Sequence, residues 1–233
     1  MRGRARVPWD ALLAAGAALV AYVVLGFAVS NSAPNGFDRG GAALLGGAQP
    51  LAILLTNAGR FPIYATVCTA TFAFALVRRE WRRPVLTATL ALIFAWVVSD
   101  RFKELFHRAR PEHWLYVRET SFGYSSGHAT LALVYYGTWI YFIAMSDAPL
   151  ALRRILIGAL VFWIVATGWS RLALGAHYPT DVIGGYLLGL AILIATLGIT
   201  ASLRAAARPK PNPAFEYSPE AIRREAARRR RER

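Results

Sequence analysis

Cysteine is almost absent from this chain: Cys68 is the only one, and it lies inside an apolar segment. A disulfide framework and a cysteine-based metal site are therefore excluded. Acidic residues are also scarce, with 13 Asp and Glu against 27 Lys and Arg. We find no internal repeat and no alternation of apolar and polar residues. Because helix-length apolar runs stand in place of that alternation, a parallel sheet and a barrel are excluded as well.

Apolar residues, in contrast, make up 56% of the 233 positions. They form blocks of about 15–20 residues separated by charged clusters, which is the pattern of a polytopic helical membrane protein. We predict an all-α fold, a bundle of six transmembrane helices. The expected spans are 10–30, 61–77, 84–102, 129–145, 155–171 and 181–202.

Two apolar stretches need a separate interpretation. The first predicted span follows a basic N-terminus like that of a signal peptide, but it is long and has no persuasive cleavage site, so we expect it to be retained. The stretch 43–59 is too short to span a membrane and is broken by Gly and Pro. We expect an interfacial or re-entrant segment there.

Basic residues predict the orientation. The loop between the second and third spans, "RREWRR" (78–83), is crowded with Arg, and more Arg lies near both ends of the chain. The positive-inside rule then places both termini in the cytoplasm and the segments after the third and fifth spans outside. All four histidines lie in those outer segments: His107, His113, His128 and His177. We therefore expect an integral cell-membrane protein with its functional face on the extracytoplasmic side.

The chain is expected to divide into a membrane domain, 1–202, and a basic tail, 203–233. The tail is rich in Pro and then in Arg, which predicts a disordered or partly helical cytoplasmic segment attracted to anionic lipid headgroups. A nucleic-acid partner is not needed to explain such a run in a membrane protein.

The sequence Ser126-Gly127-His128 opens the fourth span. Ser is a favourable N-cap, Gly lets the backbone approach a ligand, and the first amides of a helix attract an anion. His128 would then stand beside that anion and could donate a proton. Taken alone, the motif also fits an ordinary capped helix with an interfacial histidine.

A second motif opens the sixth span. Pro179 suits the first helical position, and Asp181 follows within the first turn. His177 lies four residues before Asp181, within reach of its carboxylate, which would fix the tautomer and leave the other ring nitrogen with a free lone pair. The alternative is that Asp181 only caps the helix.

Three cations lie at the ends of separate spans: Lys103, Arg110 and Arg171. Arg binds phosphate oxygens in a bidentate manner and Lys as a point charge. Arg101 and Arg108 are expected to be ordinary surface charges. If spans three to six bundle together, the three cations meet both histidines and form one site for phosphoryl transfer.

The ordered spacing Lys-x6-Arg-Pro, Ser-Gly-His and Ser-Arg-x5-His-x3-Asp resembles the type 2 phosphatidic acid phosphatase family. This family is the membrane branch of the acid phosphatase and vanadium haloperoxidase superfamily. The motifs lie within 103–181, and the layout of spans extends the resemblance over about 10–202. One position departs from the family pattern, because Ser125 stands where Pro usually precedes Ser-Gly-His, so the loop loses a fixed φ.

The resemblance implies a role for each matching residue. His177 would attack phosphorus and form a phosphohistidine, Asp181 would orient it, and His128 would protonate the leaving group. Members of the family need no metal, and no cofactor is expected here. The phosphate oxygens would be held by Lys103, Arg110, Ser126, Gly127 and Arg171.

The expected activity is hydrolysis of a lipid phosphate or diphosphate. An outward-facing site in an Arg-rich chain of bacterial character favours polyprenyl diphosphate, with phosphatidic acid and phosphatidylglycerol phosphate as alternatives. A phosphotransferase of the same family stays open, because its first half-reaction would be identical. A transporter or binding protein for lipid phosphates would also carry charges near the membrane, but it leaves the Asp-paired His177 unexplained. A metal site at His107, His113 and His128 lacks a carboxylate partner on one helical face.

Overall fold

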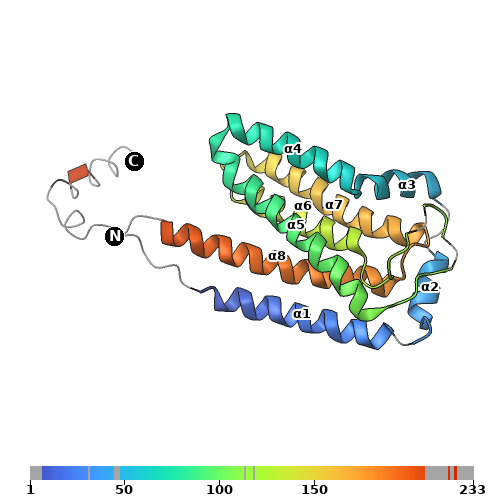
Figure 1. Cartoon of the computed structure of the whole chain (residues 1–233). Helices are drawn as coiled ribbons and strands as arrows, with labels where there is room; N and C mark the ends of the chain where they lie inside the picture. Colours follow the sequence, from blue (N-terminus) through green and yellow to red (C-terminus); the bar gives the residue numbers. More distant parts are fainter. Residues whose placement is uncertain are drawn as a thin grey trace. The chain divides into compact units, whose positions relative to one another are not determined.

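A computed structural model shows an all-helical chain, as predicted (Figure 1). The structure describes residues 7–30, 32–44, 48–112, 114–117, 119–207, 220 and 223–224, and no strand occurs among them. The helices are α1 (Trp9–Ser30), α2 (Gly36–Leu44), α3 (Gln49–Ala58), α4 (Phe61–Val77), the 3₁₀ helix η1 (Arg79–Trp81), α5 (Arg82–Phe106), α6 (Gly127–Ala144), α7 (Leu150–Ala173) and α8 (Pro179–Ala207).

The chain divides into two compact units. One runs from Trp9 to Gly198 and carries the helices described below, and the other combines Met1–Pro8 with Ile199–Arg233. Within the second unit, Ile199 to Ala207 is the helical end of α8. The predicted tail falls almost wholly outside the described residues, so the division into 1–202 and 203–233 stays a prediction.

Each of the six predicted spans falls on one long helix, but fewer of these helices are both long enough and apolar enough to count as spans by themselves. Among the described residues, four helical segments have the length and composition to cross a membrane, namely α1, η1 with α5, α7 and α8. A fifth is added if α3 and α4, which meet at a bend of 48°, form one broken span. Helix α6 is not among them, because polar groups such as His128, Thr130 and Thr138 interrupt its apolar residues. Exactly six spans remain a prediction.

The unit Trp9–Gly198 exposes large apolar side chains along its length. On α1, for example, Leu13, Val24 and Phe27 are each more than half exposed. A soluble protein rarely exposes such a continuous apolar surface, whereas lipid chains would cover it at no cost. The helices therefore belong in a bilayer.

Helix α6 lies inside the bundle, where it packs against α5 and α7 and meets α8 closely. The contact with α8 depends on small residues, because a Cβ added at Gly185 would lie 2.5 Å from the carbonyl oxygen of Ser126. Two hydrogen bonds fix this contact. Thr130 Oγ1 donates to the carbonyl of Gly185 (3.0 Å), and the backbone N–H of Ser126 donates to the carbonyl of Asp181 (3.0 Å). The starts of α6 and α8 are thereby locked together.

Within the unit Trp9–Gly198, the starts of α6 and α8 share one end with α2, α3 and the segment between α5 and α6 (Figure 1). The turn that contains η1 lies at the opposite end. The motif residues and the Arg-rich loop 78–83 are therefore separated by the length of the helices.

Candidate active site

Three parts of the chain form the candidate site: the end of α5, the segment 107–126 with the start of α6, and the turn between α7 and α8. They bring together the predicted residues from all three motifs. Most of these side chains are buried, including Lys103, Ser126, Arg171, His177 and Asp181. Because burying charged groups is costly, such a cluster needs compensating contacts or a functional reason.

His177 is in the middle of the site and is almost fully buried, at 1% exposure. Its Nε2 atom lies 3.0 Å from Nη1 of Arg110. A guanidinium can only donate, so Nε2 must carry the lone pair and Nδ1 must carry the ring proton. Nδ1 faces the Asp181 carboxylate, with 3.4 Å between Nδ1 and Oδ2. This distance is too long for a good hydrogen bond, but the order of groups is the one that the sequence motif predicts.

The surroundings of His177 keep its ring neutral. Burial lowers the pKa of His177 most, and the positive charges of Arg110 and Arg171 lower it further, to well below its ordinary value of 6.5. A neutral imidazole with a free lone pair on Nε2 is what nucleophilic attack requires.

Asp181 has a second partner, Arg108, and the prediction that this arginine is a surface charge is wrong. Arg108, expected to be a surface charge, is 4% exposed and donates from Nη1 to Oδ1 of Asp181. The other carboxylate oxygen of Asp181 accepts the backbone N–H of Tyr178 at 2.9 Å. Asp181 therefore caps the start of α8 and faces His177 at the same time. The prediction failed for Arg108 because nothing in a charged run indicates which of its members meets a partner far along the chain.

Arg108 extends this network to α2. Its Nη2 donates to Oδ2 of Asp38 at 2.6 Å, and Asp38 in turn accepts the backbone N–H of Thr180 at 3.0 Å. Asp38 is fully buried. Two buried carboxylates thus share one guanidinium, an arrangement in which removal of the cation would leave both unpaired.

Glu119 bridges two of the predicted phosphate-binding cations. Its carboxylate accepts from Nη2 of Arg110 and from Nη2 of Arg171, both at 2.9 Å. Burial raises the pKa of Glu119, but the charges of Arg171 and Arg110 outweigh this and hold it below its ordinary value. An ionised carboxylate therefore binds the two guanidinium groups that the family resemblance assigns to phosphate.

Hydroxyl groups complete the cation cluster. Ser121 Oγ accepts from Lys103 Nζ at 3.1 Å and from Arg110 Nη2 at 3.0 Å, so it joins two of the three predicted cations. Arg171 donates from Nη1 to Thr56 Oγ1 of α3 at 2.6 Å. No sequence motif includes Glu119, Ser121 or Thr56.

The start of α6 lies beside this cluster, but its cap differs from the prediction. Ser126 occupies the N-cap position, yet its hydroxyl makes no capping hydrogen bond. Its Oγ, Nε2 of His128 and Nε of Arg171 are buried and have no hydrogen-bond partner among the described residues. Unpaired buried polar atoms are uncommon, and those beside a helix N-terminus are well placed to bind an anion.

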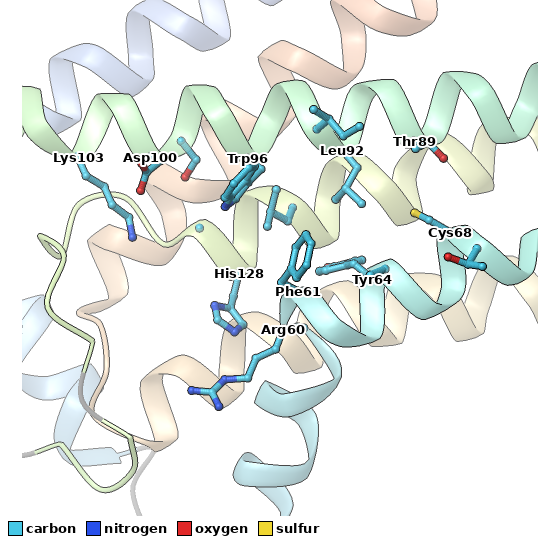
Figure 2. A pocket seen from close by; sticks show the side chains of 17 residues that line it. Arg60, Phe61, Tyr64, Cys68, Thr89, Leu92, Trp96, Asp100, Lys103 and His128 are labelled. Carbon is cyan, nitrogen blue, oxygen red and sulfur yellow. The ribbon is translucent and has the colours of Figure 1, made fainter. Parts of the chain in front are cut away.

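An apolar groove leads away from the site along α4, α5 and α6 (Figure 2). Arg60, Lys103 and His128 lie at one end of it, and Cys68 and Thr89 at the other. Aromatic and aliphatic side chains such as Tyr64, Leu92 and Trp96 line the stretch between them. The volume of the groove is about 440 Å³.

No three His, Cys, Asp or Glu side chains come together as metal ligands do in the part of the chain that the structure describes. His113, one of the three histidines considered for a metal site, lies outside the described residues.

Comparison with known proteins identifies the family. The PAP2 superfamily matches residues 84–204, just over half of the chain. The chain therefore belongs to the PAP2 superfamily, the group that its three motifs resemble.

Three curated relatives have names that refer to a phosphatase of a lipid phosphate or diphosphate. Phosphatidylglycerophosphatase B of Bacillus subtilis is 33% identical over 109 residues, which cover 46% of this chain and 54% of that protein. Undecaprenyl-diphosphatase of Sulfolobus acidocaldarius is 24% identical over 148 residues, 60% of this chain and 64% of that protein. Lipid A 1-phosphatase of Rhizobium etli is 32% identical over 101 residues, 42% of each chain. The chain thus spans about half to two thirds of the first two relatives.

A solved structure has the same fold. It is the crystal structure of a transmembrane PAP2 type phosphatidylglycerolphosphate phosphatase from Bacillus subtilis. The two chains superpose with a TM-score of 0.71 and 22% identity, over 81% of this chain and 96% of that one.

Proposed function

We propose that this protein is an integral membrane phosphatase that hydrolyses a lipid phosphate or diphosphate, in the first place a polyprenyl diphosphate. One observation carries the proposal: a neutral, buried His177 contacts Arg110, and Ser121 joins Arg110 to Lys103, which lies with His128 at the end of an apolar groove. The cations suit a phosphate, and the groove suits a lipid chain. The names of the relatives have a lipid-linked phosphate in common, which supports the same substrate class.

In the proposed reaction, Nε2 of His177 attacks phosphorus. The bond between phosphorus and the leaving oxygen breaks, the oxygen keeps the electron pair, and His128 supplies a proton to it. The imidazole becomes positively charged as the nitrogen–phosphorus bond forms, and the Asp181 carboxylate beside Nδ1 stabilises that charge. Water then attacks the phosphorus of the phosphohistidine, and His128 takes up the proton of the water. The nitrogen–phosphorus bond breaks, its electron pair returns to Nε2 of His177, and phosphate is released.

The phosphate oxygens are proposed to bind Lys103, Arg110, Arg171 and the first amides of α6, around Ser126 and Gly127. Arg110 must change partners on the way, because its Nη1 lies on the lone pair of Nε2 that attacks. A phosphate that draws Arg110 onto its own oxygens would free the nucleophile as it binds. Binding and activation would then be one event.

The lipid chain is proposed to lie in the groove along α4, α5 and α6. Large apolar side chains at its rim, including Phe61, Ile93 and Trp96, are more than half exposed on the outside of the bundle. In a bilayer these side chains would face lipid, so a substrate could enter sideways while its headgroup stays near the cations.

For the position in the membrane, we propose six spans with both termini in the cytoplasm and the site on the extracytoplasmic side. One observation supports the orientation, and another supports the number of spans. The Arg-rich loop 78–83 is at the end of the helices opposite the site, and basic loops favour the cytoplasm. Helix α6, with 18 residues, is long enough to count as the sixth span, and its Thr130 and Thr138 lie within the bundle, where each hydroxyl donates to a backbone carbonyl.

The test is phosphate release by the purified protein in the presence of EDTA. The substrates are a polyprenyl diphosphate, phosphatidic acid and phosphatidylglycerol phosphate in detergent. We expect release by the wild type and a loss of about a thousandfold or more in His177→Ala, since the nucleophile is gone. Rapid quenching with a terminally labelled substrate should trap label on the wild type and none on His177→Ala.

Arg101→Gln serves as the control, because Arg101 is an exposed arginine on the same helix as Lys103. The proposal is wrong if folded wild-type protein releases phosphate from none of the three lipids. Product that forms only when a lipid or sugar acceptor is added would identify a phosphotransferase instead.

A further inference from the structure

Arg60 is a cation at the site that none of the three motifs includes. It lies at the bend between α3 and α4 and is the N-cap residue of α4. Its side chain is half-buried and lines the same end of the groove as the side chain of His128 (Figure 2).

The local structure holds Arg60 in this position. Its guanidinium lies over the ring of Tyr116, 5.4 Å from the centroid, and Tyr116 donates its hydroxyl to Oδ1 of Asn57 at 3.2 Å. The preceding residue, Gly59, packs on the imidazole of His128, since an added Cβ would lie 2.9 Å from Cδ2. The bend therefore packs the residue before Arg60 on the proposed general acid, His128, and both side chains line the same end of the groove.

Among the described residues, Arg60 differs from the other arginines of the site in having no anionic partner, whereas Lys103 likewise binds only a hydroxyl, that of Ser121. Arg110 and Arg171 share the Glu119 carboxylate, and Arg108 binds Asp38 and Asp181. Within the described part of the chain, no carboxylate lies within ion-pair distance of Arg60. A half-buried guanidinium that is fixed on an aromatic ring but unpaired is available for an anionic group of the substrate.

We infer that Arg60 binds the second phosphate of a lipid diphosphate, the one that leaves with the lipid, and thereby selects diphosphates over monophosphates. This inference rests on the proposed function. In that reaction the attacked phosphorus lies between His177 and the leaving oxygen, and His128 is on the leaving side. Arg60, beside His128 and at the start of the groove, lies where the lipid-linked phosphate would be.

The chemistry of the two substrate types supports this role. From a lipid monophosphate, the leaving oxygen becomes an alcohol and needs the proton of His128. From a diphosphate, the bond from the attacked phosphorus to the bridging oxygen breaks, and a lipid monophosphate leaves with the electron pair and an added negative charge. A cation at that point stabilises this charge as it develops, and it has no comparable task with a monophosphate.

The experiment compares Arg60→Gln and Arg60→Lys with the wild type on two substrates that share one polyprenyl chain, the diphosphate and the monophosphate. We expect Arg60→Gln to lower kcat/KM for the diphosphate by about ten- to a hundredfold, as loss of a charge-assisted contact does, and for the monophosphate by less than about threefold. Arg60→Lys should retain part of the diphosphate activity. Arg101→Gln, the matched exposed arginine, should change neither.

An equal loss on both substrates, or no loss on the diphosphate, would overturn the inference. A second measurement needs no turnover: protection against thermal unfolding by methylenediphosphonate and by methylphosphonate, neither of which can be hydrolysed at the P–C bond. Arg60→Gln should weaken protection by the diphosphonate only, and an unchanged diphosphonate effect would also overturn the inference. If the wild type hydrolyses no lipid, the proposed function fails, and this binding result still decides whether Arg60 holds a second phosphate.

Discussion

At the scale of single residues, the charged groups of the site already have partners, and a phosphate would have to replace some of them. Glu119 binds Arg110 and Arg171, and Arg110 also covers the Nε2 atom of His177. The side chain of Glu119 is 28% exposed, so its ion pairs are partly screened by solvent. It resembles a phosphate in charge and in its ability to accept from two guanidinium groups at once.

We therefore expect Glu119→Gln to bind phosphate more tightly than the wild type does. With the competing carboxylate gone, the inhibition constant of inorganic phosphate should fall about five- to tenfold, in line with two partly screened ion pairs. The control is Glu112→Gln, an exposed glutamate of the same segment. Weaker inhibition in Glu119→Gln would show instead that Glu119 holds the arginines in their binding positions.

His177 gives a second prediction, on stability against pH. Its folded-state pKa lies well below 6.5, so the unfolded chain binds a proton below that pH and the folded chain does not. The contribution of the neutral His177 ring to the free energy of unfolding is fully present above about pH 6.5. Below that pH it falls, by up to about 1.4 kcal/mol per pH unit. The Tm of the wild type should therefore fall between pH 7.5 and 5, and that of His177→Gln should fall less.

The control for this measurement is His107→Asn, which changes an exposed histidine at a position with a φ of 48° that Asn tolerates. The Tm of this variant should fall between pH 7.5 and 5 by as much as the Tm of the wild type does. Equal pH dependence in His177→Gln and the wild type would contradict the assigned protonation state.

Residue identity and spacing predicted the parts of the site that lie close together in sequence. His177 faces Asp181 because both flank the start of one helix, and this follows from their spacing. The partnership of Arg108 with Asp38 joins residues 70 positions apart, and no local pattern encodes it. Glu119 and Arg60 were missed for the same reason, since each acquires its meaning only when separate helices pack.

At the scale of helices, the site depends on how closely α6 and α8 approach. Gly185 allows the backbone of α8 to lie against the carbonyl of Ser126, which places the start of α6 over that of α8. Long apolar runs predicted that both helices exist. They did not predict this contact, because glycine in an apolar segment fits a lipid-facing surface equally well.

Gly185→Ala should therefore be costly and Gly158→Ala should not. The new methyl group at position 185 would have to displace backbone, which costs about 1–3 kcal/mol and would shift His128, so we expect a lower Tm and a reduced kcat. Gly158 is on α7, and a Cβ there meets nothing within 4 Å. Similar Tm values for the two variants would mean that the helices can separate without penalty.

At the scale of the whole protein, the orientation in the membrane is the property with the clearest test. In a Cys68→Ala background, Leu115→Cys adds a thiol at an exposed position of the segment between α5 and α6. We expect an impermeant maleimide to label it in intact cells. Glu80→Cys, in the turn at the other end of the helices, should be labelled only after lysis. The reverse result would invert the proposed topology.

The groove along α4, α5 and α6 has a kinetic consequence. Because its rim is apolar and exposed toward the surrounding lipid, the protein would meet its substrate by diffusion within the plane of the membrane rather than from solution. The quantity that sets the rate would then be the mole fraction of substrate among the lipids of one leaflet. In mixed micelles, adding detergent at a constant amount of substrate should slow the reaction by surface dilution, although the bulk substrate concentration is unchanged.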